Sequence, residues 1–165
     1  MRFVGRTETA WLSEAEMHAW RAMIETAIGL VATLDNELQA AHGLTLGDYE
    51  VLAHLSEAPG HSLRMTDLAS RLHLSPSGIT RRIDGMVRAG LVERHQCPTD
   101  RRGSNAVLTE HGMEVLQRAA PTHVEGVRRH FVDRLSADQL ADVATALSRV
   151  AVDPGAAAGG CDGAR

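Results

Sequence analysis

The sequence predicts a mainly α-helical fold that carries one small β-hairpin. Hydrophobic residues make up 44% of the 165-residue chain but aromatic residues only 3%, so its core must be largely aliphatic, which favours helices over an aromatic-rich sheet. Between residues 91 and 108 the sequence reads as two short strands joined by a polar turn. Hydroxyl residues with the chemistry of helix N-caps recur along the chain, at Ser13, Thr45, Ser75, Thr109 and Ser136.

The first predicted helix spans residues 14–41. Ser13 and Glu16 form a capping box at its start, and Gly43 is placed to end it. Apolar residues recur in this segment at spacings of three and four, namely Met17, Trp20, Ile24, Ala27, Val31, Leu34 and Leu38. This spacing predicts a long amphipathic helix with one continuous apolar face.

Further helices and two strands follow the first helix. The helices are predicted at residues 46–58, 66–72, 75–89, 109–135 and 137–150, and the strands at residues 91–95 and 105–108. Pro121 lies inside the longest of these helices and predicts a disturbance there. Residues 153–165 are rich in Gly and Ala with almost no bulky apolar side chain, so we expect this tail to be disordered.

The order of elements between residues 66 and 108 is that of a winged helix-turn-helix. Two short helices meet at a turn, and a hairpin with a basic tip follows them. In this fold the second helix enters the major groove of DNA, and the hairpin reaches the backbone or the minor groove. We therefore expect residues 45–108 to bind double-stranded DNA.

The distribution of charge agrees with this expectation, although the whole chain has a formal net charge of −4. From Arg64 to Arg102, eight arginines stand against four acidic residues, so this segment carries +4 and the remainder −8. A locally positive surface on an acidic body attracts phosphate at one place and repels it elsewhere.

The start of the helix predicted at residues 75–89 carries the first candidate DNA contacts, Ser75, Ser77, Gly78, Thr80, Arg81 and Arg82. Hydroxyl and backbone N–H groups at a helix N-terminus bind phosphate, and an Arg can donate two hydrogen bonds to guanine O6 and N7. Ser75 could instead be a helix cap alone. Arg82, about 100° around the helix from Arg81, could contact phosphate or form an ion pair inside the protein. Gly78 would let the helix approach DNA closely.

The tip of the hairpin carries the second set of candidates, Asp100, Arg101 and Arg102. Arg102 is the candidate for insertion into the minor groove, where A·T-rich narrowing attracts guanidinium groups. Arg101 is a candidate phosphate contact. A solvated basic turn is the alternative for both arginines.

With these residues in place, the chain resembles the MarR (multiple antibiotic resistance regulator) family of transcription factors over residues 12–150. The resemblance implies a homodimeric winged-helix repressor that a small phenolic or otherwise aromatic molecule releases from DNA. The wing of this family usually reads Asp-Pro-x-Asp-Arg-Arg; Cys97 stands at the first Asp here, and the resemblance implies a salt bridge from Asp100 to Arg102. The motifs that carry the resemblance are Leu68-Ala69 with Leu72, Ser75-Pro76-Ser77-Gly78-Ile79-Thr80-Arg81, Gly90-Leu91-Val92-Glu93-Arg94, Asp100-Arg101-Arg102 and Leu108-Thr109-Glu110-His111-Gly112.

The helices at both ends of the chain, within residues 12–44 and 109–151, are expected to form a dimerisation region. They are long and amphipathic, and they bury little against a small DNA-binding region. Two-fold symmetry would place two recognition helices about one DNA turn apart, roughly 34 Å, on a pseudo-palindromic operator.

The resemblance also places the first helix beside an effector cavity. The candidate effector contacts are Trp11, His18, Trp20, Arg21, Tyr49 and His54. Packing in the core is the alternative for each of them, because a Trp on an apolar stripe is more often a core residue than part of a ligand site.

Several other function classes find no support in the sequence. We expect no cofactor, no metal site and no enzyme activity, because the nine histidines are scattered and no catalytic motif stands out. No apolar run approaches the roughly 20 residues of a membrane span, and the N-terminus lacks the apolar segment of a signal peptide. These observations predict a cytoplasmic protein.

Two alternatives to an effector-controlled regulator remain. Cys97 lies close to Arg94, His95 and Arg101 in the sequence, and this basic setting could lower the pKa of its thiol and make the protein redox-responsive. A winged-helix module used for protein assembly is the other alternative. It is disfavoured because such a module needs no cluster of exposed arginines.

Overall fold

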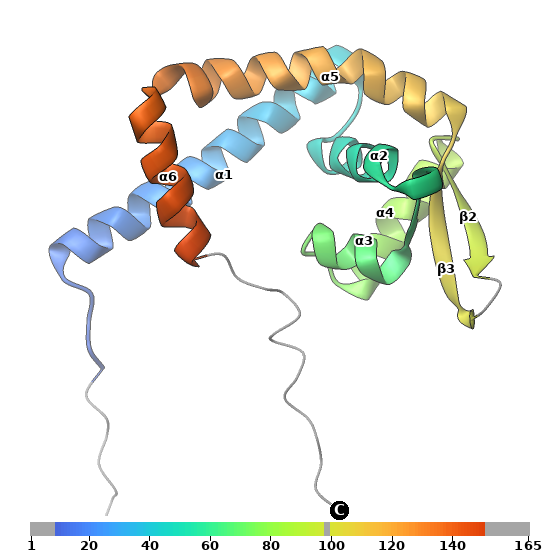
Figure 1. Ribbon diagram of the computed structural model, residues 1–165, viewed down its shortest axis with the longest axis horizontal. Coiled ribbons are helices and arrows are strands. Elements are labelled where there is room, and N and C mark those ends of the chain that lie inside the picture. Colours follow the sequence, from blue (N-terminus) through green and yellow to red (C-terminus); the bar gives the residue numbers. More distant parts are fainter. Residues whose placement is uncertain (1–8, 98–99, 151–165) are drawn as a thin grey trace, which may run out of the picture. The chain divides into compact units, whose positions relative to one another are not determined.

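The computed structural model describes residues 9–97 and 100–150, with the backbone alone at residues 97 and 100–102. The predicted disordered tail therefore lies outside the described residues. The helices are α1 (Glu14–His42), α2 (Leu46–Glu57), α3 (Met65–Arg71), α4 (Pro76–Arg88), α5 (Glu110–His130) and α6 (Ala137–Val150), the strands are β1 (Ser62–Arg64), β2 (Val92–Cys97) and β3 (Asp100–Leu108), and the single 3-10 turns are η1 (Pro59–His61) and η2 (Val132–Arg134) (Figure 1).

The predicted N-caps are confirmed by their hydrogen bonds. The side chains of Thr45, Ser75 and Thr109 each accept a hydrogen bond from the backbone N–H three residues later, at 3.0, 3.1 and 2.9 Å. Ser13 and Ser136 form capping boxes, in which the backbone N–H of each donates to Glu16 or Gln139 at 2.7 and 2.9 Å. These local contacts satisfy N–H groups that a helix leaves without partners at its start.

The helix ends agree with the prediction at two glycines and differ from it in α5. Gly43 and Gly90 have φ angles of 64° and 72°, in the left-handed region that glycine adopts at helix C-termini. The predicted disturbance at Pro121 is wrong, because α5 is continuous from Glu110 to His130 although Pro121 cannot donate to the carbonyl of Gln117. The helix then stops short of the predicted residue 135, and η2 (Val132–Arg134) follows it.

The wing contains a strand that the sequence did not predict. β1 joins the two expected strands in an antiparallel sheet of order β1-β3-β2, with Arg64 opposite Asn105 and Val92 opposite Leu108. A strand of three residues is too short to show a two-residue alternation, so sequence reasoning missed it. The sheet ties the wing to the segment that enters α3.

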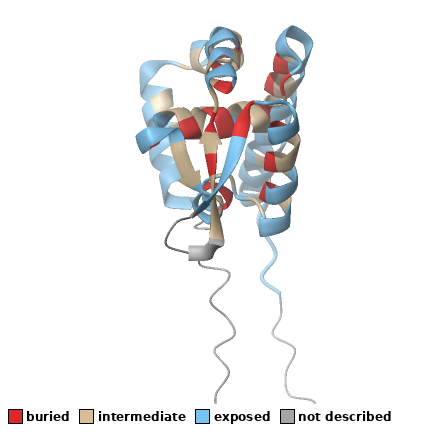
Figure 2. Ribbon diagram, turned by 90° about the vertical axis from the view of Figure 1, so that its right-hand side faces the viewer, coloured by how far each residue is buried: buried red, intermediate tan, exposed pale blue. Residues whose placement is uncertain are grey.

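By its contacts the chain divides into two compact units, Met1–Thr33 and Leu34–Arg165. The core of the second unit is aliphatic, as predicted, and α2, α3, α4, α5 and the sheet all contribute to it. Figure 2 shows buried positions alternating with exposed ones along these elements, so each turns one side inward. The most deeply buried side chains are Leu38, Leu52, Leu55, Leu68, Ile79, Ile83, Val51 and Val92.

Large apolar side chains lie exposed on α1, just before it, and on α6. In the first unit, Trp11 is 87% exposed and Trp20 is 51% exposed. In the second unit, α6 has no buried residue, and Leu147 and Val150 are 47% and 60% exposed. No helix among the described residues is both long and apolar enough to cross a bilayer.

Candidate nucleic-acid interface

Helix α4 turns one face to the core and presents the opposite face to solvent. Ile79, Ile83 and Met86 are buried, whereas Thr80 and Arg81 are exposed. Because a helix repeats every 3.6 residues, the three buried positions hold the helix by one side. Thr80 and Arg81, two of the residues predicted to contact DNA, are therefore held away from the core.

The first turn of α4 is organised by Ser75. Its Oγ accepts the N–H of Gly78 at 3.1 Å and lies 3.2 Å from Oγ of Ser77, and both serines are exposed. The cap predicted for Ser75 is thus present, and a phosphate contact remains a separate prediction. Gly78 is half-buried, and a Cβ built on it would lie 3.2 Å from Ser75 Oγ and 3.8 Å from Leu74 Cβ. The absence of a side chain at residue 78 therefore leaves room for the cap and for Leu74.

Thr80 and Arg81 stand on the exposed face of α4. The hydroxyl of Thr80 donates to the backbone carbonyl of Pro76 at 2.8 Å, so it keeps its methyl group and its acceptor lone pairs for a partner. Arg81 belongs to the surface formed by Ser77, Thr80, Asp84 and Arg88. A guanidinium group has five N–H donors, and two of them can bind O6 and N7 of one guanine edge.

Arg82, which the sequence left open between a phosphate contact and an internal ion pair, forms the internal pair. Its Nη1 donates to Asp48 Oδ1 at 3.0 Å and lies 3.4 Å from Thr45 Oγ1, both at the start of α2. The side chains of Arg82 and Asp48 are 29% and 27% exposed. Arg82 and Arg81 are neighbours in sequence but have different surroundings.

A second ion pair joins α4 to the wing. Arg94 Nη2 of β2 lies 3.1 Å from Asp84 Oδ1. Arg94 also lines a groove of about 700 Å³ beside α3, the first half of α4 and β3. His73 lines the same groove from the turn between α3 and α4, where it adopts a φ of 52°. Sequence reasoning missed Arg94 and His73 as members of this surface; the excess of arginine in the segment was the available signal.

The tip of the wing is described by its backbone. Cys97 pairs with Asp100 across the β2–β3 hairpin, after a register shift between Gln96 and Cys97. The side chains of Cys97, Asp100, Arg101 and Arg102 lie outside the description, so their predicted roles stay predictions.

The candidate effector residues fall into both units. Trp11, His18, Trp20 and Arg21 lie in the first unit and are exposed there. Tyr49 and His54 lie in α2 and are half-buried.

Tyr49 has a partner that the sequence did not indicate. Its ring centroid lies 4.4 Å from that of His123 in α5, with 37° between the planes. Burial raises the pKa of Tyr49, and the charge of Glu57 acts in the same direction. Burial lowers the pKa of His123, and the negative charge of Glu50 offsets part of this shift. Nδ1 of His123 is buried without a hydrogen-bond partner among the described side chains. No periodic or motif signal marks His123 in the sequence.

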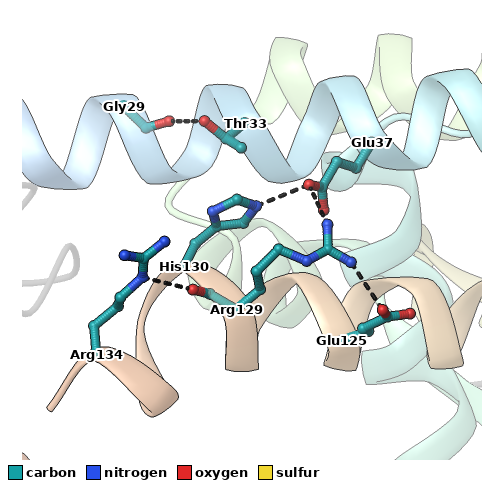
Figure 3. Close-up of polar contacts among 7 residues, drawn as sticks. All are labelled: Gly29, Thr33, Glu37, Glu125, Arg129, His130 and Arg134. Atoms are coloured by element: carbon teal, nitrogen blue, oxygen red, sulfur yellow. Dashed lines mark hydrogen bonds and ion pairs between the residues drawn. The ribbon is translucent and has the colours of Figure 1, made fainter.

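A polar cluster joins the second half of α1 to the end of α5 (Figure 3). Glu37 Oε1 lies 2.8 Å from His130 Nε2 and accepts from Arg129 Nη1 at 3.1 Å, while Arg129 Nη2 donates to Glu125 at 2.9 Å. The hydrogen bond from His130 lowers the pKa of Glu37; burial opposes this shift, and the positive charges of His130 and Arg129 add to it. Gly126 permits the close approach, because a Cβ there would lie 2.6 Å from Glu37 Oε2.

Comparisons with known proteins identify the family. The model of the MarR family matches residues 42–103. Over 111 residues, 67% of this chain and 70% of the relative, the chain is 31% identical to the uncharacterized HTH-type transcriptional regulator YkoM of Bacillus subtilis. It is also 34% identical to the HTH-type transcriptional repressor YetL of the same species. That similarity extends over 97 residues, 57% of this chain and 58% of YetL. The chain spans between half and three fifths of the length of the first curated relatives that it matches.

Solved structures extend the similarity along most of the chain. AbsC, a MarR family transcriptional regulator from Streptomyces coelicolor, is 44% identical with a TM-score of 0.81, over 86% of this chain and 95% of AbsC. Sco3205 from the same species, solved in complex with DNA, is 37% identical with a TM-score of 0.83, over 86% of this chain and 89% of Sco3205. These similarities confirm the predicted winged helix-turn-helix with long helices at both ends, and the chain belongs to the MarR family of transcriptional regulators.

Proposed function

We propose that the protein is a homodimeric regulator that binds a pseudo-palindromic operator and represses transcription. The exposed face of α4 is the observation that carries this proposal. Thr80 and Arg81 project from a helix whose opposite face is held by Ile79, Ile83 and Met86. The similarity to Sco3205, whose structure was solved in complex with DNA, supports DNA binding by this chain as well.

The proposed contacts divide by chemistry. Arg81 donates two hydrogen bonds to a guanine edge in the major groove, and Thr80 offers its methyl group and lone pairs to a neighbouring base. The hydroxyl groups of Ser75 and Ser77, together with the backbone N–H of Ser77, bind phosphate. Arg101 and Arg102 reach the backbone and minor groove from the wing, with Asp100 holding Arg102.

The exposed apolar side chains support a homodimer. Trp11, Trp20, Leu147 and Val150 are each roughly half or more exposed in the single chain. Burying such side chains against a second copy removes apolar surface from water, which contributes about 25 cal/mol for each Å² buried. A two-fold axis would then present two copies of α4 to successive major grooves about 34 Å apart.

A small aromatic or phenolic effector would act through the spacing of these two helices. A ligand that binds better to a dimer whose recognition helices no longer match both half-sites shifts the population away from the DNA-bound form. The ring of His123 packs at a tilt against Tyr49, and its buried Nδ1 has no hydrogen-bond partner among the described residues. Both observations support α2 and α5 as the place where a hydroxyl or carboxylate group of such a ligand binds.

Selection from random DNA duplexes tests the operator proposal. The purified wild type should enrich a palindrome whose half-site centres lie about 10 base pairs apart. Sedimentation should show a dimer both free and bound to that duplex. A monomer, or a selection that enriches no palindrome, would contradict the proposal and favour the alternative of a protein-assembly module.

A further inference from the structure

We infer that Arg82 is a positioning residue: it ties α4 to the start of α2 and sets the orientation from which Arg81 meets DNA. This inference rests on the proposed DNA-binding function and concerns a residue on the same helix. Arg82 reaches Asp48 Oδ1 and Thr45 Oγ1, so its guanidinium group has two acceptors on one neighbouring helix.

The acceptors belong to a rigid turn. Thr45 is the N-cap of α2, and its Oγ1 accepts the N–H of Asp48 at 3.0 Å. The backbone N–H of Leu46 in turn donates to Asp35 Oδ1 at 2.7 Å. Arg82 therefore binds to a part of the protein whose own position is held by hydrogen bonds on both sides.

Gly47 leaves the space in which the guanidinium group lies. A Cβ built on Gly47 would lie 2.6 Å from Cζ of Arg82 and 2.7 Å from its Nη2, closer than real Cβ contacts. The planar group thus packs directly over the α2 backbone. A Lys would place a single ammonium there and lack the planar fork that fits this site.

The ion pair complements the buried face of α4. Ile79, Ile83 and Met86 define which side of the helix is inward, but apolar contacts are non-directional and leave the rotation of a helix loosely determined. A hydrogen-bonded ion pair has a preferred distance and direction. Because Arg81 is the next residue, a rotation of α4 that breaks the Arg82 contact also moves Arg81.

The charge balance gives the pair a second role. Thr45, Asp48 and Arg82 line one groove together with Arg81. Without Arg82, the carboxylate of Asp48 would place an unbalanced negative charge beside the surface that meets phosphate. Paired with Arg82, it does not repel DNA there.

Three single variants test the inference against the alternative that Arg82 contacts phosphate. Arg82→Met removes the guanidinium group, Asp48→Asn removes its charged acceptor, and Gly47→Ala displaces the guanidinium while retaining both charges. Binding is measured with the duplex enriched by the wild type and with a mixed-sequence duplex, over a range of salt concentrations.

If Arg82 is a positioning residue, each variant lowers the ratio of specific to non-specific affinity by about tenfold. The salt dependence of binding stays as in the wild type for Gly47→Ala, which retains both charges, and for the Arg82→Met/Asp48→Asn double variant, which removes both. The double variant loses no more of the affinity ratio than either single variant. Arg128→Gln, which breaks the exposed pair with Asp133 outside the DNA-binding region, is the control and keeps the wild-type ratio.

A direct phosphate contact predicts the opposite pattern. The double variant would then reduce the salt slope by about 0.9, and Asp48→Asn would strengthen binding by freeing the guanidinium group. Either result overturns the inference, as does an unchanged ratio in all three variants. Thermal melts confirm that each variant is folded, and Gly47→Ala retains the test if Arg82→Met does not fold.

A measurement without DNA separates this inference from the proposed function. In a double-mutant cycle on denaturant midpoints, the effects of Arg82→Met and Asp48→Asn should be non-additive. Additive effects would overturn the inferred coupling of Arg82 to Asp48, even if the DNA selection yields an operator. If the selection enriches no DNA sequence while the two substitutions remain non-additive, the proposed function is overturned but the contact between Arg82 and Asp48 is retained.

Discussion

Helices α4 and α6 are of similar length and both are amphipathic, yet they differ in how their apolar sides are covered. The 13-residue α4 buries Ile79, Ile83 and Met86 within its own chain. The 14-residue α6 buries none of its residues and leaves Leu147 and Val150 exposed. The same kind of amphipathic pattern therefore occurs in α4, where the chain itself covers the apolar side, and in α6, where the apolar side is left exposed.

The largest expected effect is the loss of a core side chain from α4. Ile83 is fully buried, so Ile83→Ala removes buried methyl groups and leaves a cavity. We expect the free energy of unfolding to fall by about 2–5 kcal/mol, measured by urea denaturation. Val87→Ala on the exposed side of the same helix is the control, and an equal loss there would show that α4 has no distinct inward face.

The matching change in α6 should act on assembly. Leu147→Asp places a charge on the side that we propose is covered by a second copy, and we expect dimer affinity to fall at least about tenfold. Sedimentation equilibrium across a dilution series measures this change. The variant should keep its helix content by circular dichroism, and a dimer of undiminished affinity would remove α6 from the interface.

A smaller effect separates the two interpretations of Ser75. Ser75→Ala removes the acceptor of the Gly78 N–H, and we expect it to cost about 1 kcal/mol of unfolding free energy. Ser77→Ala, which leaves that cap in place, should change stability by less than about 0.5 kcal/mol. Operator binding by the two variants then reports the phosphate contacts. If Ser75→Ala alters stability while DNA affinity at matched folded fraction stays unchanged, Ser75 is a cap alone.

The smallest effect concerns the cluster at the end of α5. The pKa of Glu37 is lower in the folded protein than its ordinary value of 4.5, so the folded state favours the ionised form. Its contribution to stability is present above about pH 4.5 and is lost as the pH falls through the lower folded pKa. Glu37→Gln should therefore remove part of the acid-dependent fall in unfolding free energy, measured by denaturation between pH 3 and 7.

The exposed Glu25→Gln on the same helix is the control for that series, and it should retain the wild-type pH profile. An identical profile for Glu37→Gln and the wild type would show that the contacts to His130 and Arg129 do not affect stability.

The features that could be read directly from the sequence depend on neighbouring residues. The N-caps at Ser75 and Thr109, the glycine that ends α4 and the alternation of inward and outward residues along α4 all follow from spacings of seven residues or fewer. Helix hydrogen bonds and caps connect residues three or four apart, so the pattern itself contains the partners. Because these signals are local, the order of two helices and a hairpin could be predicted from the sequence as a winged helix-turn-helix.

The tertiary structure alone decided which distant groups meet. Arg82 pairs with Asp48, 34 residues away, and Tyr49 packs on His123, 74 residues away. β1 exists as a strand because β3 supplies its hydrogen-bond partners from the other side of the DNA-binding region. A side chain offers the same donors wherever the chain carries it, so its partner depends on the packing of whole elements. That is why the sequence left Arg82 open between a phosphate contact and an internal ion pair, and why the folded chain was needed to show the pair with Asp48.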